Sequence, residues 1–302
     1  MKEEKVVVIG AGQMGSQIAA LSAMAGIDTN LFDEDETQLK EKIEFTKKNI
    51  ANLIQKEKLT KVHGENYENF LAPCVTLEQS VQNRTFAIEA VTERLDIKHE
   101  IFNFLSKNTK ENTVLASNSS FITGTQLAEA TNCPSRVLNM HFFYPPIRMD
   151  LIEVAYNECV EQDFIDRTVE LGNKMERKVV VLKKETPGFI VNRMLAALVD
   201  EAFQLYKEGI ASFEDIDIAI EKGLNHPLGP YRLADYSGLD IHYYAKLKLA
   251  EESDDPSRRP RRCFIKSPPS DRFSLINIIS SKILTFSCSL LLNSACLAFW
   301  TA

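Results

Sequence analysis

Short apolar runs alternate with longer amphipathic stretches over the first part of the chain. Residues 6–9, Val-Val-Val-Ile, are wholly apolar and β-branched, which is typical of a strand buried on both faces. The same pattern predicts further strands at residues 27–32, 86–90, 113–116, 136–140, 151–155 and 179–182. Helical patterns lie between them, notably at residues 16–25 and 34–58. Strands that alternate with helices predict an α/β domain with a doubly wound parallel sheet.

The pattern changes after residue 185. Pro187-Gly188 opens a helical pattern, and proline suits the first turn of a helix, where its missing N–H is not needed. The chain then reads as mainly helical to about Glu252. We therefore expect an α/β domain over residues 1–185 and an all-helical C-terminal domain over residues 186–252.

A third region, residues 253–302, fits neither domain. It begins with a stretch rich in arginine and proline, and residues 283–302 are uncharged and mostly apolar. Three interpretations compete: a membrane anchor, which needs about 20 apolar residues, a buried helix, or foreign sequence such as a shifted reading frame. Serine, asparagine and cysteine interrupt the apolar run, so we favour foreign sequence and expect no membrane partner.

Composition narrows the class of protein. The net charge of -7 argues against nucleic-acid binding, because neutralising phosphates needs a basic face. Six cysteines without paired spacing are expected to be reduced thiols, which favours a cytoplasmic location. The first residues lack an apolar signal segment, and no Cys/His cluster has metal-ligand spacing. We expect no metal.

Glycines follow the first predicted strand and open the first predicted helix, at Gly10, Gly12 and Gly15. In that context they indicate a Rossmann dinucleotide site: Gly10 allows the tight turn, Gly12 lets the backbone approach a pyrophosphate, and Gly15 allows close packing of helix on strand. Asp33 ends the second strand, about 20 residues later, where a carboxylate binds ribose hydroxyls and repels a 2′-phosphate. NAD is therefore favoured over NADP. FAD uses a similar fingerprint and stays open on these residues alone.

Polar side chains also mark the ends of later strands. Residues 117–120, Ser-Asn-Ser-Ser, follow one strand and His141 follows another, and ligands gather at such carboxyl ends. Glu153 lies between Ile152 and Val154 in a third strand, where an ionised carboxylate is costly without a partner. A histidine beside it would satisfy it and would gain a fixed orientation, suited to taking a proton from an alcohol.

Each of these residues also has an ordinary structural explanation. His141 alone could be a core histidine, Glu153 an edge-strand acid facing water, and Asn192 a helix-surface amide. Their joint presence beside a dinucleotide fingerprint favours a catalytic site, in which Asn192 would reach a substrate oxygen.

Several stretches together resemble the L-3-hydroxyacyl-CoA dehydrogenase family, including the bacterial 3-hydroxybutyryl-CoA dehydrogenases. They occur in the family's order over residues 5 to about 250. The matching stretches are residues 8–15, 89–93, 116–120, 141–143, 186–193 and 226–230, with Asp235 and 238–240 behind them.

The resemblance implies an NAD-dependent oxidoreductase that converts 3-hydroxyacyl-CoA to 3-ketoacyl-CoA in fatty-acid metabolism and β-oxidation. It implies a general base, His141, oriented by Glu153, with Ser120 and Asn192 holding the reacting oxygen. It implies a homodimer where the C-terminal domain is intact. The residues implied to bind the cofactor are Gly10, Gly12, Gln13, Met14, Gly15, Asp33, Glu93, Lys98 and Ser120. Lys47, Lys48, Lys56 and Lys58 are candidates for the CoA phosphates, although such charges usually mark a solvated face.

The chain departs from the family pattern in two places. Tyr144 stands where the family often has asparagine, which puts one cofactor contact in doubt. After residues 255–260, Asp-Pro-Ser-Arg-Arg-Pro, the family's final helices are not recognisable. Two other functions remain as alternatives: a related dehydrogenase of 3-hydroxy acids without CoA, such as carnitine, and a non-catalytic, crystallin-like NAD-binding protein.

Overall fold

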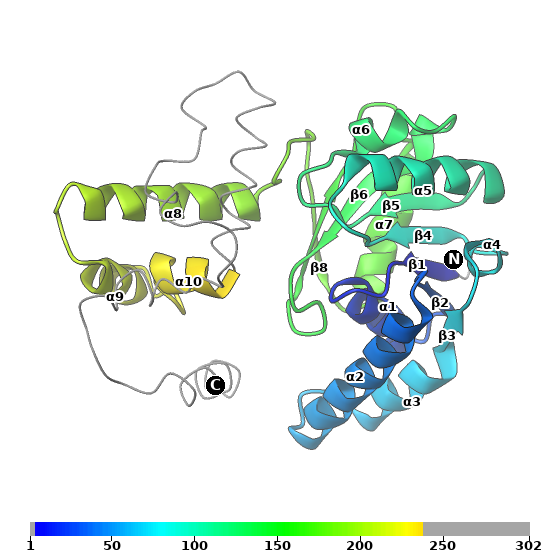
Figure 1. Ribbon diagram of the computed structural model, residues 1–302, viewed down its shortest axis with the longest axis horizontal. Coiled ribbons are helices and arrows are strands. Elements are labelled where there is room, and N and C mark those ends of the chain that lie inside the picture. Colours follow the sequence, from blue (N-terminus) through cyan, green and yellow to red (C-terminus); the bar gives the residue numbers. More distant parts are fainter. Residues whose placement is uncertain (1–3, 238–302) are drawn as a thin grey trace. The chain divides into compact units, whose positions relative to one another are not determined.

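The computed structural model describes residues 4–237, and the predicted tail at 253–302 lies outside these residues. The described chain passes from one compact unit to a second between Arg193 and Met194. The first unit is a sheet with helices on both faces, and the second is helical (Figure 1). The α/β fold class with a helical C-terminal part is therefore confirmed.

The sheet has eight strands in the order β3-β2-β1-β4-β5-β6-β7-β8. Their bounds are β1 (Val6–Ile9), β2 (Thr29–Phe32), β3 (Leu71–Cys74), β4 (Phe86–Glu89), β5 (Val114–Ser117), β6 (Val137–Phe142), β7 (Leu151–Ala155) and β8 (Lys178–Val181). All neighbouring pairs are parallel except β6 and β7. The sequence pattern did not indicate this antiparallel pair, because apolar runs carry no information about strand direction.

Helices cover both faces of the sheet. Those of the first unit are α1 (Gly15–Met24), α2 (Glu36–Gln55), α3 (Lys61–Phe70), α4 (Leu77–Ser80), α5 (Leu95–Asn108), α6 (Gly124–Ala128) and α7 (Gln162–Lys174), with a 3₁₀ turn η1 (Pro134–Arg136). Helices α5 and α7 lie on opposite faces (Figure 1). Strand β1 shows why: Val6 and Val8 belong to the apolar core on one face, and Val7 and Ile9 to the core on the other. Burial on both faces accounts for the unbroken apolar run.

The structure differs from the prediction most clearly in two boundaries and one additional strand. Strand β6 continues to Phe142, so His141 lies within the strand instead of after it. Strand β3 was not predicted, because its sequence Leu-Ala-Pro-Cys contains a proline. The strand lies at the sheet edge, where proline is tolerated because its missing N–H is not needed for pairing on the open side. The helix expected at Pro187 begins at Val191. Gly188 and Phe189 have positive φ angles of 75° and 45°, which a right-handed helix excludes.

The second unit contains the rest of α8 (Val191–Lys207), with α9 (Phe213–Gly223) and α10 (Pro230–Ser237). Its apolar core includes Ala202, Ile216 and Tyr231, and the Tyr231 hydroxyl donates to the Ala202 carbonyl at 2.9 Å. Asp217 is 3% exposed and accepts from the Tyr231 backbone N–H at 2.8 Å, which satisfies a donor in the first turn of α10. No helix within residues 4–237 is long and apolar enough to cross a membrane.

Candidate active site

The glycine-rich turn joins β1 to α1 as predicted. Gly10 has φ of 101°, and a Cβ there would lie 2.7 Å from the Ala90 carbonyl oxygen. A Cβ on Gly15 would lie 1.8 Å from the Gly10 oxygen. The protein itself therefore requires glycine at both positions.

Gly12 has a different reason to be glycine. A Cβ at this position would meet no protein atom within 4 Å, and its φ does not require glycine. No side chain caps the amino end of α1, which begins three residues later. A phosphate held against this turn would use both the space at Gly12 and the N–H groups of the helix end. The residues present therefore fit a dinucleotide, and Gln13 and Met14 lie in the same turn.

Asp33 fixes this turn from the neighbouring strand. It is 9% exposed, and its Oδ2 accepts from the Ala11 N–H at 2.6 Å and from Gln38 Nε2 at 3.0 Å. Its Oδ1 accepts from the Asp35 N–H at 3.0 Å and keeps one acceptor position, since a carboxylate oxygen accepts two hydrogen bonds. The carboxylate can thus bind one ribose hydroxyl while it holds the glycine turn.

Ser120, His141 and Glu153 form one hydrogen-bonded chain. Ser120 Oγ lies 3.0 Å from His141 Nε2, and His141 Nδ1 lies 3.2 Å from Glu153 Oε2. The histidine and the glutamate face each other directly in the antiparallel register of β6 and β7. Because an ionised carboxylate only accepts, Nδ1 carries the proton and Nε2 presents a lone pair in the neutral imidazole.

Glu153 has a second role that the sequence analysis missed. Its Oε1 accepts from the N–H groups of Ile190 and Val191, both at 3.0 Å, at the amino end of α8. One carboxylate, 1% exposed, therefore satisfies the helix end and orients the histidine. Asn192 is the second residue of this helix and is half-buried, so Glu153 also fixes the segment that carries it.

Aromatic rings enclose the imidazole. The ring of Phe143 meets His141 edge to face with centroids 4.7 Å apart, and that of Phe189 lies at 5.3 Å. Phe189 is 1% exposed in the turn before α8, and the neighbouring Gly188 N–H donates to the Ser120 carbonyl at 3.0 Å. These contacts limit rotation of the ring and exclude water from it. Tyr144 is 52% exposed and follows Phe143.

Lys98 is 1% exposed, and its Nζ lies 2.6 Å from Glu89 Oε1 and 3.5 Å from Glu93 Oε2. Glu89 was not among the predicted site residues. A signal was present, since Glu89 follows the apolar run Phe86-Ala87-Ile88, where an ionised carboxylate is costly without a partner, as it is at Glu153. Glu93 in turn accepts from the Ser119 hydroxyl and, at 3.1 Å, from the Phe121 N–H.

Other candidate positions lie apart from this network. Lys47 Nζ forms an exposed ion pair with Glu68 at 2.7 Å, and Lys48, Lys56 and Lys58 are exposed. Within residues 4–237, no group of three His, Cys, Asp or Glu side chains is placed to hold a metal ion.

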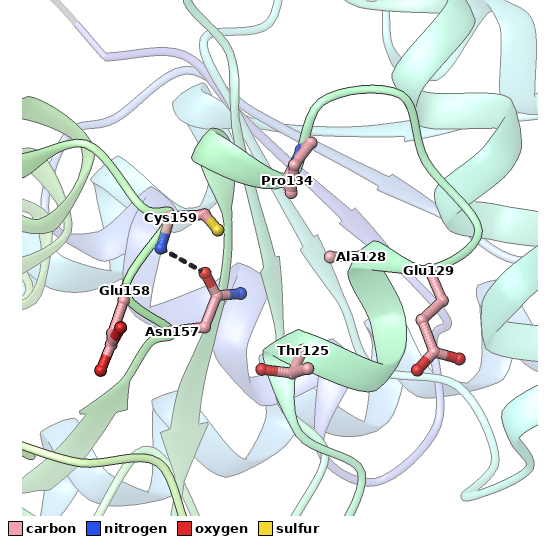
Figure 2. A pocket seen from close by; sticks show the side chains of 7 residues that line it. All are labelled: Thr125, Ala128, Glu129, Pro134, Asn157, Glu158 and Cys159. Atoms are coloured by element: carbon pink, nitrogen blue, oxygen red, sulfur yellow. Dashed lines mark hydrogen bonds between the residues drawn. The ribbon is translucent and has the colours of Figure 1, made fainter.

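A shallow pocket lies at the other end of β6 (Figure 2). It is lined by Thr125, Ala128, Glu129, Pro134, Asn157, Glu158 and Cys159. Pro134 precedes the first residue of β6, whereas His141 is the fifth of its six residues. Its lining contains none of the residues of the hydrogen-bonded chain, so we do not assign the chemistry to it.

Two family models cover most of the chain. The NAD binding domain of 3-hydroxyacyl-CoA dehydrogenase matches residues 5–186, and the C-terminal domain of the same family matches residues 188–274. The second match includes residues 253–274 of the tail, and residues 275–302 lie outside both matches. NAD is the cofactor of the matched N-terminal domain.

Individual relatives agree with the family models. The chain is 36% identical to 3-hydroxybutyryl-CoA dehydrogenase of Clostridioides difficile over 78% of this chain and 84% of the relative. It is 37% identical to the human mitochondrial hydroxyacyl-coenzyme A dehydrogenase over 89% and 87%. The structure of (S)-3-hydroxybutyryl-CoA dehydrogenase from Ralstonia eutropha superposes with a TM-score of 0.82 and 31% identity, covering 87% of this chain and 93% of that one. The chain therefore belongs to the 3-hydroxyacyl-CoA dehydrogenase family of oxidoreductases.

Proposed function

We propose that this chain catalyses the reversible, NAD-dependent oxidation of L-3-hydroxyacyl-CoA thioesters to 3-ketoacyl-CoA, with 3-hydroxybutyryl-CoA as a representative substrate. The observation that carries the proposal is the hydrogen-bonded chain from Ser120 through His141 to Glu153. The names of the relatives supply the substrate class.

His141 is the proposed general base. Its Nε2 takes the proton of the 3-hydroxyl during oxidation and returns it during reduction. The cofactor, when bound, would supply the hydride acceptor as NAD and the hydride donor as NADH. Glu153 stabilises the imidazolium that forms and keeps the ring oriented. Because the carboxylate is also held by two backbone N–H groups, it does not have to reorganise as the charge appears.

Ser120 and Asn192 are proposed to hold the reacting oxygen. The Ser120 hydroxyl lies 3.0 Å from Nε2. It can turn its single O–H from Nε2 to a substrate oxygen bound there, which leaves the Nε2 lone pair to take the proton of the substrate hydroxyl. The role of Asn192 is supported by its position in the first turn of α8, whose amino end is held by Glu153.

Cofactor binding is proposed for Gly10, Gly12, Gln13, Met14, Gly15, Asp33, Glu93, Lys98 and Ser120. The order of the strands supports this set, since β2, β1, β4, β5 and β6 are successive neighbours. Their carboxyl ends carry, in that order, Asp33, the glycine turn, Glu93 with Lys98, Ser120 and His141. An extended dinucleotide laid across these ends reaches from Asp33 toward the catalytic histidine.

Three broader proposals accompany this assignment. We propose a role in fatty-acid β-oxidation or a short-chain acyl-CoA pathway, and a cytoplasmic location, supported by free thiols at Cys74, Cys133 and Cys159. We also propose that residues 186–252 form the substrate and dimerisation domain of a homodimer. Exposed apolar side chains on α8 and α9, such as Met194 at 69% and Ile218 at 50%, support an interface there.

The deciding experiment is NADH oxidation by the purified full chain with acetoacetyl-CoA, with free carnitine and NAD as the comparison reaction. We expect turnover with acetoacetyl-CoA and none with carnitine. Turnover only with carnitine would replace the substrate class. NADH binding without turnover of either compound would favour the non-catalytic alternative.

A further inference from the structure

Three charged side chains form a cluster at the carboxyl ends of β4 and β5. In this Glu–Lys–Glu cluster, Lys98 lies between Glu89 at 2.6 Å and Glu93 at 3.5 Å. The exposed fractions of the side chains are 0% for Glu89, 1% for Lys98 and 39% for Glu93. Two carboxylates share one ammonium group, so the cluster carries a formal charge of about −1.

The surrounding hydrogen bonds hold these charges in place. Glu89 also accepts from the Ser117 hydroxyl at 2.6 Å and from the Val91 N–H at 2.7 Å. The Ser117 hydroxyl accepts from the Ser119 N–H at 3.0 Å, and the Ser119 hydroxyl donates to Glu93. Together these bonds connect the loop after β4 with the loop after β5 in a closed ring. Charges fixed in this way cannot rearrange when the charge of a neighbouring ligand changes.

The cluster lies where the cofactor must pass. Glu89 pairs with Ile9 where β1 and β4 are neighbours. From β1 the chain adds β2 and β3 on one side, and from β4 it adds β5 to β8 on the other, so the strand order reverses at this point. Ligands of doubly wound sheets bind in the crevice at such a switch point. Asp33 lies on one side of the glycine turn and His141 on the other. A dinucleotide bound from Asp33 toward His141 would therefore cross the ends of β4 and β5.

We propose that the Glu–Lys–Glu cluster favours the oxidised cofactor over the reduced one. The nicotinamide ring is a cation in NAD and neutral in NADH, so a fixed negative charge attracts the oxidised form selectively. The adjacent Arg94 is paired with Asp96, and Glu153 keeps its own charge in every variant below. The inference rests on the proposed function, because it takes the nicotinamide to point toward His141.

Glu93→Gln provides the test. Glutamine keeps an oxygen that accepts from Ser119 and Phe121, but the cluster becomes neutral while the buried Lys98 retains Glu89 as its partner. We expect the ratio of Kd for NAD to Kd for NADH to rise about three- to tenfold. NADH fluorescence titration, with NAD as competitor, measures both constants on the full chain without any substrate.

One control separates charge from shape. Glu93→Asp keeps the negative charge while it shortens the side chain. Its ratio should stay within about twofold of the original, with melting temperature as the check of folding.

An unchanged ratio in Glu93→Gln, or an equal rise in Glu93→Asp, overturns the inference alone. Failure of the unmodified chain to bind either cofactor form overturns the proposed function and the inference together.

Discussion

Two buried carboxylates organise the two ends of the candidate site. Asp33 binds backbone N–H groups at Ala11 and Asp35, close to the strand that carries it. Glu153 binds backbone N–H groups at Ile190 and Val191 and also the ring of His141. Each accepts hydrogen bonds from backbone N–H groups that, within residues 4–237, have no other partner in a helix or strand. Only Glu153 also contacts a side chain, His141, that can exchange protons near neutral pH. The proposed cofactor end is thus suited to binding, and the proposed catalytic end is suited to proton transfer.

His141→Gln should have the largest effect, because it should lower kcat at the catalytic end and leave NADH binding at the cofactor end unchanged. The amide cannot accept the substrate proton, so kcat should fall about 10²–10⁴-fold, whereas NADH affinity should stay almost unchanged because Asp33 and the glycine turn are intact. Steady-state kinetics and NADH titration check both values. A collapse of NADH affinity would show that His141 supports the fold of the site and would contradict its catalytic role.

Glu153→Gln and Glu153→Ala should divide the two roles of this carboxylate. Glutamine keeps an oxygen for the α8 N–H groups but removes the charge beside the imidazole, so kcat should fall about 10–100-fold with the melting temperature largely kept. Alanine also leaves buried donors unsatisfied and should cost about 1–3 kcal/mol more in the free energy of unfolding. Chemical denaturation distinguishes the variants, and equal stabilities would argue against the helix-end role.

Asp33→Asn should act on the cofactor end alone. The amide retains one oxygen for the Ala11 N–H but no longer repels a 2′-phosphate, so the preference for NADH over NADPH should fall about tenfold. The kcat at saturating NADH should change little, because the hydrogen-bonded chain at His141 is intact. Titration with both cofactors tests this, and an unchanged preference would assign the discrimination to other residues.

Asp28→Asn should have the smallest effect of these variants, because Asp28 is a partly exposed carboxylate outside the candidate site. Partial burial raises the pKa of Asp28, but the hydrogen bonds and charges of Arg84 at 2.7 Å and Lys5 at 3.2 Å outweigh burial and lower the pKa below its ordinary value. A lowered pKa stabilises the fold above the pKa of the unfolded chain, about 3.9. Because the side chain is 39% exposed, the loss at neutral pH should be about 0.5 kcal/mol.

The difference between this variant and the unmodified chain should disappear as the pH falls below the pKa of the folded state. Urea unfolding at neutral and acidic pH measures it, and a difference that persists in acid would have another cause.

The sequence predicted the cofactor end more fully than the catalytic end. The glycines and Asp33 belong to one contiguous β-α-β segment, whose geometry follows from local turn and strand chemistry. His141 and Glu153 were paired as a hypothesis, but their facing positions depend on the antiparallel alignment of β6 and β7. The Glu89–Lys98 pair was missed, although Lys98 was named and Glu89 follows an apolar run. The polar residues around Lys98 in the sequence did not indicate that this lysine would be buried.

By itself, the sequence determined the α/β order of elements, the dinucleotide turn and the candidate chemistry, because apolar periodicity and glycine spacing act over short stretches of chain. Only the tertiary structure decided which way β7 runs, where α8 begins and how Glu153 reaches both His141 and that helix. Those features join residues that are far apart along the chain. Their partners are selected by the need to satisfy buried charges and backbone N–H groups, which arises only once the elements have packed.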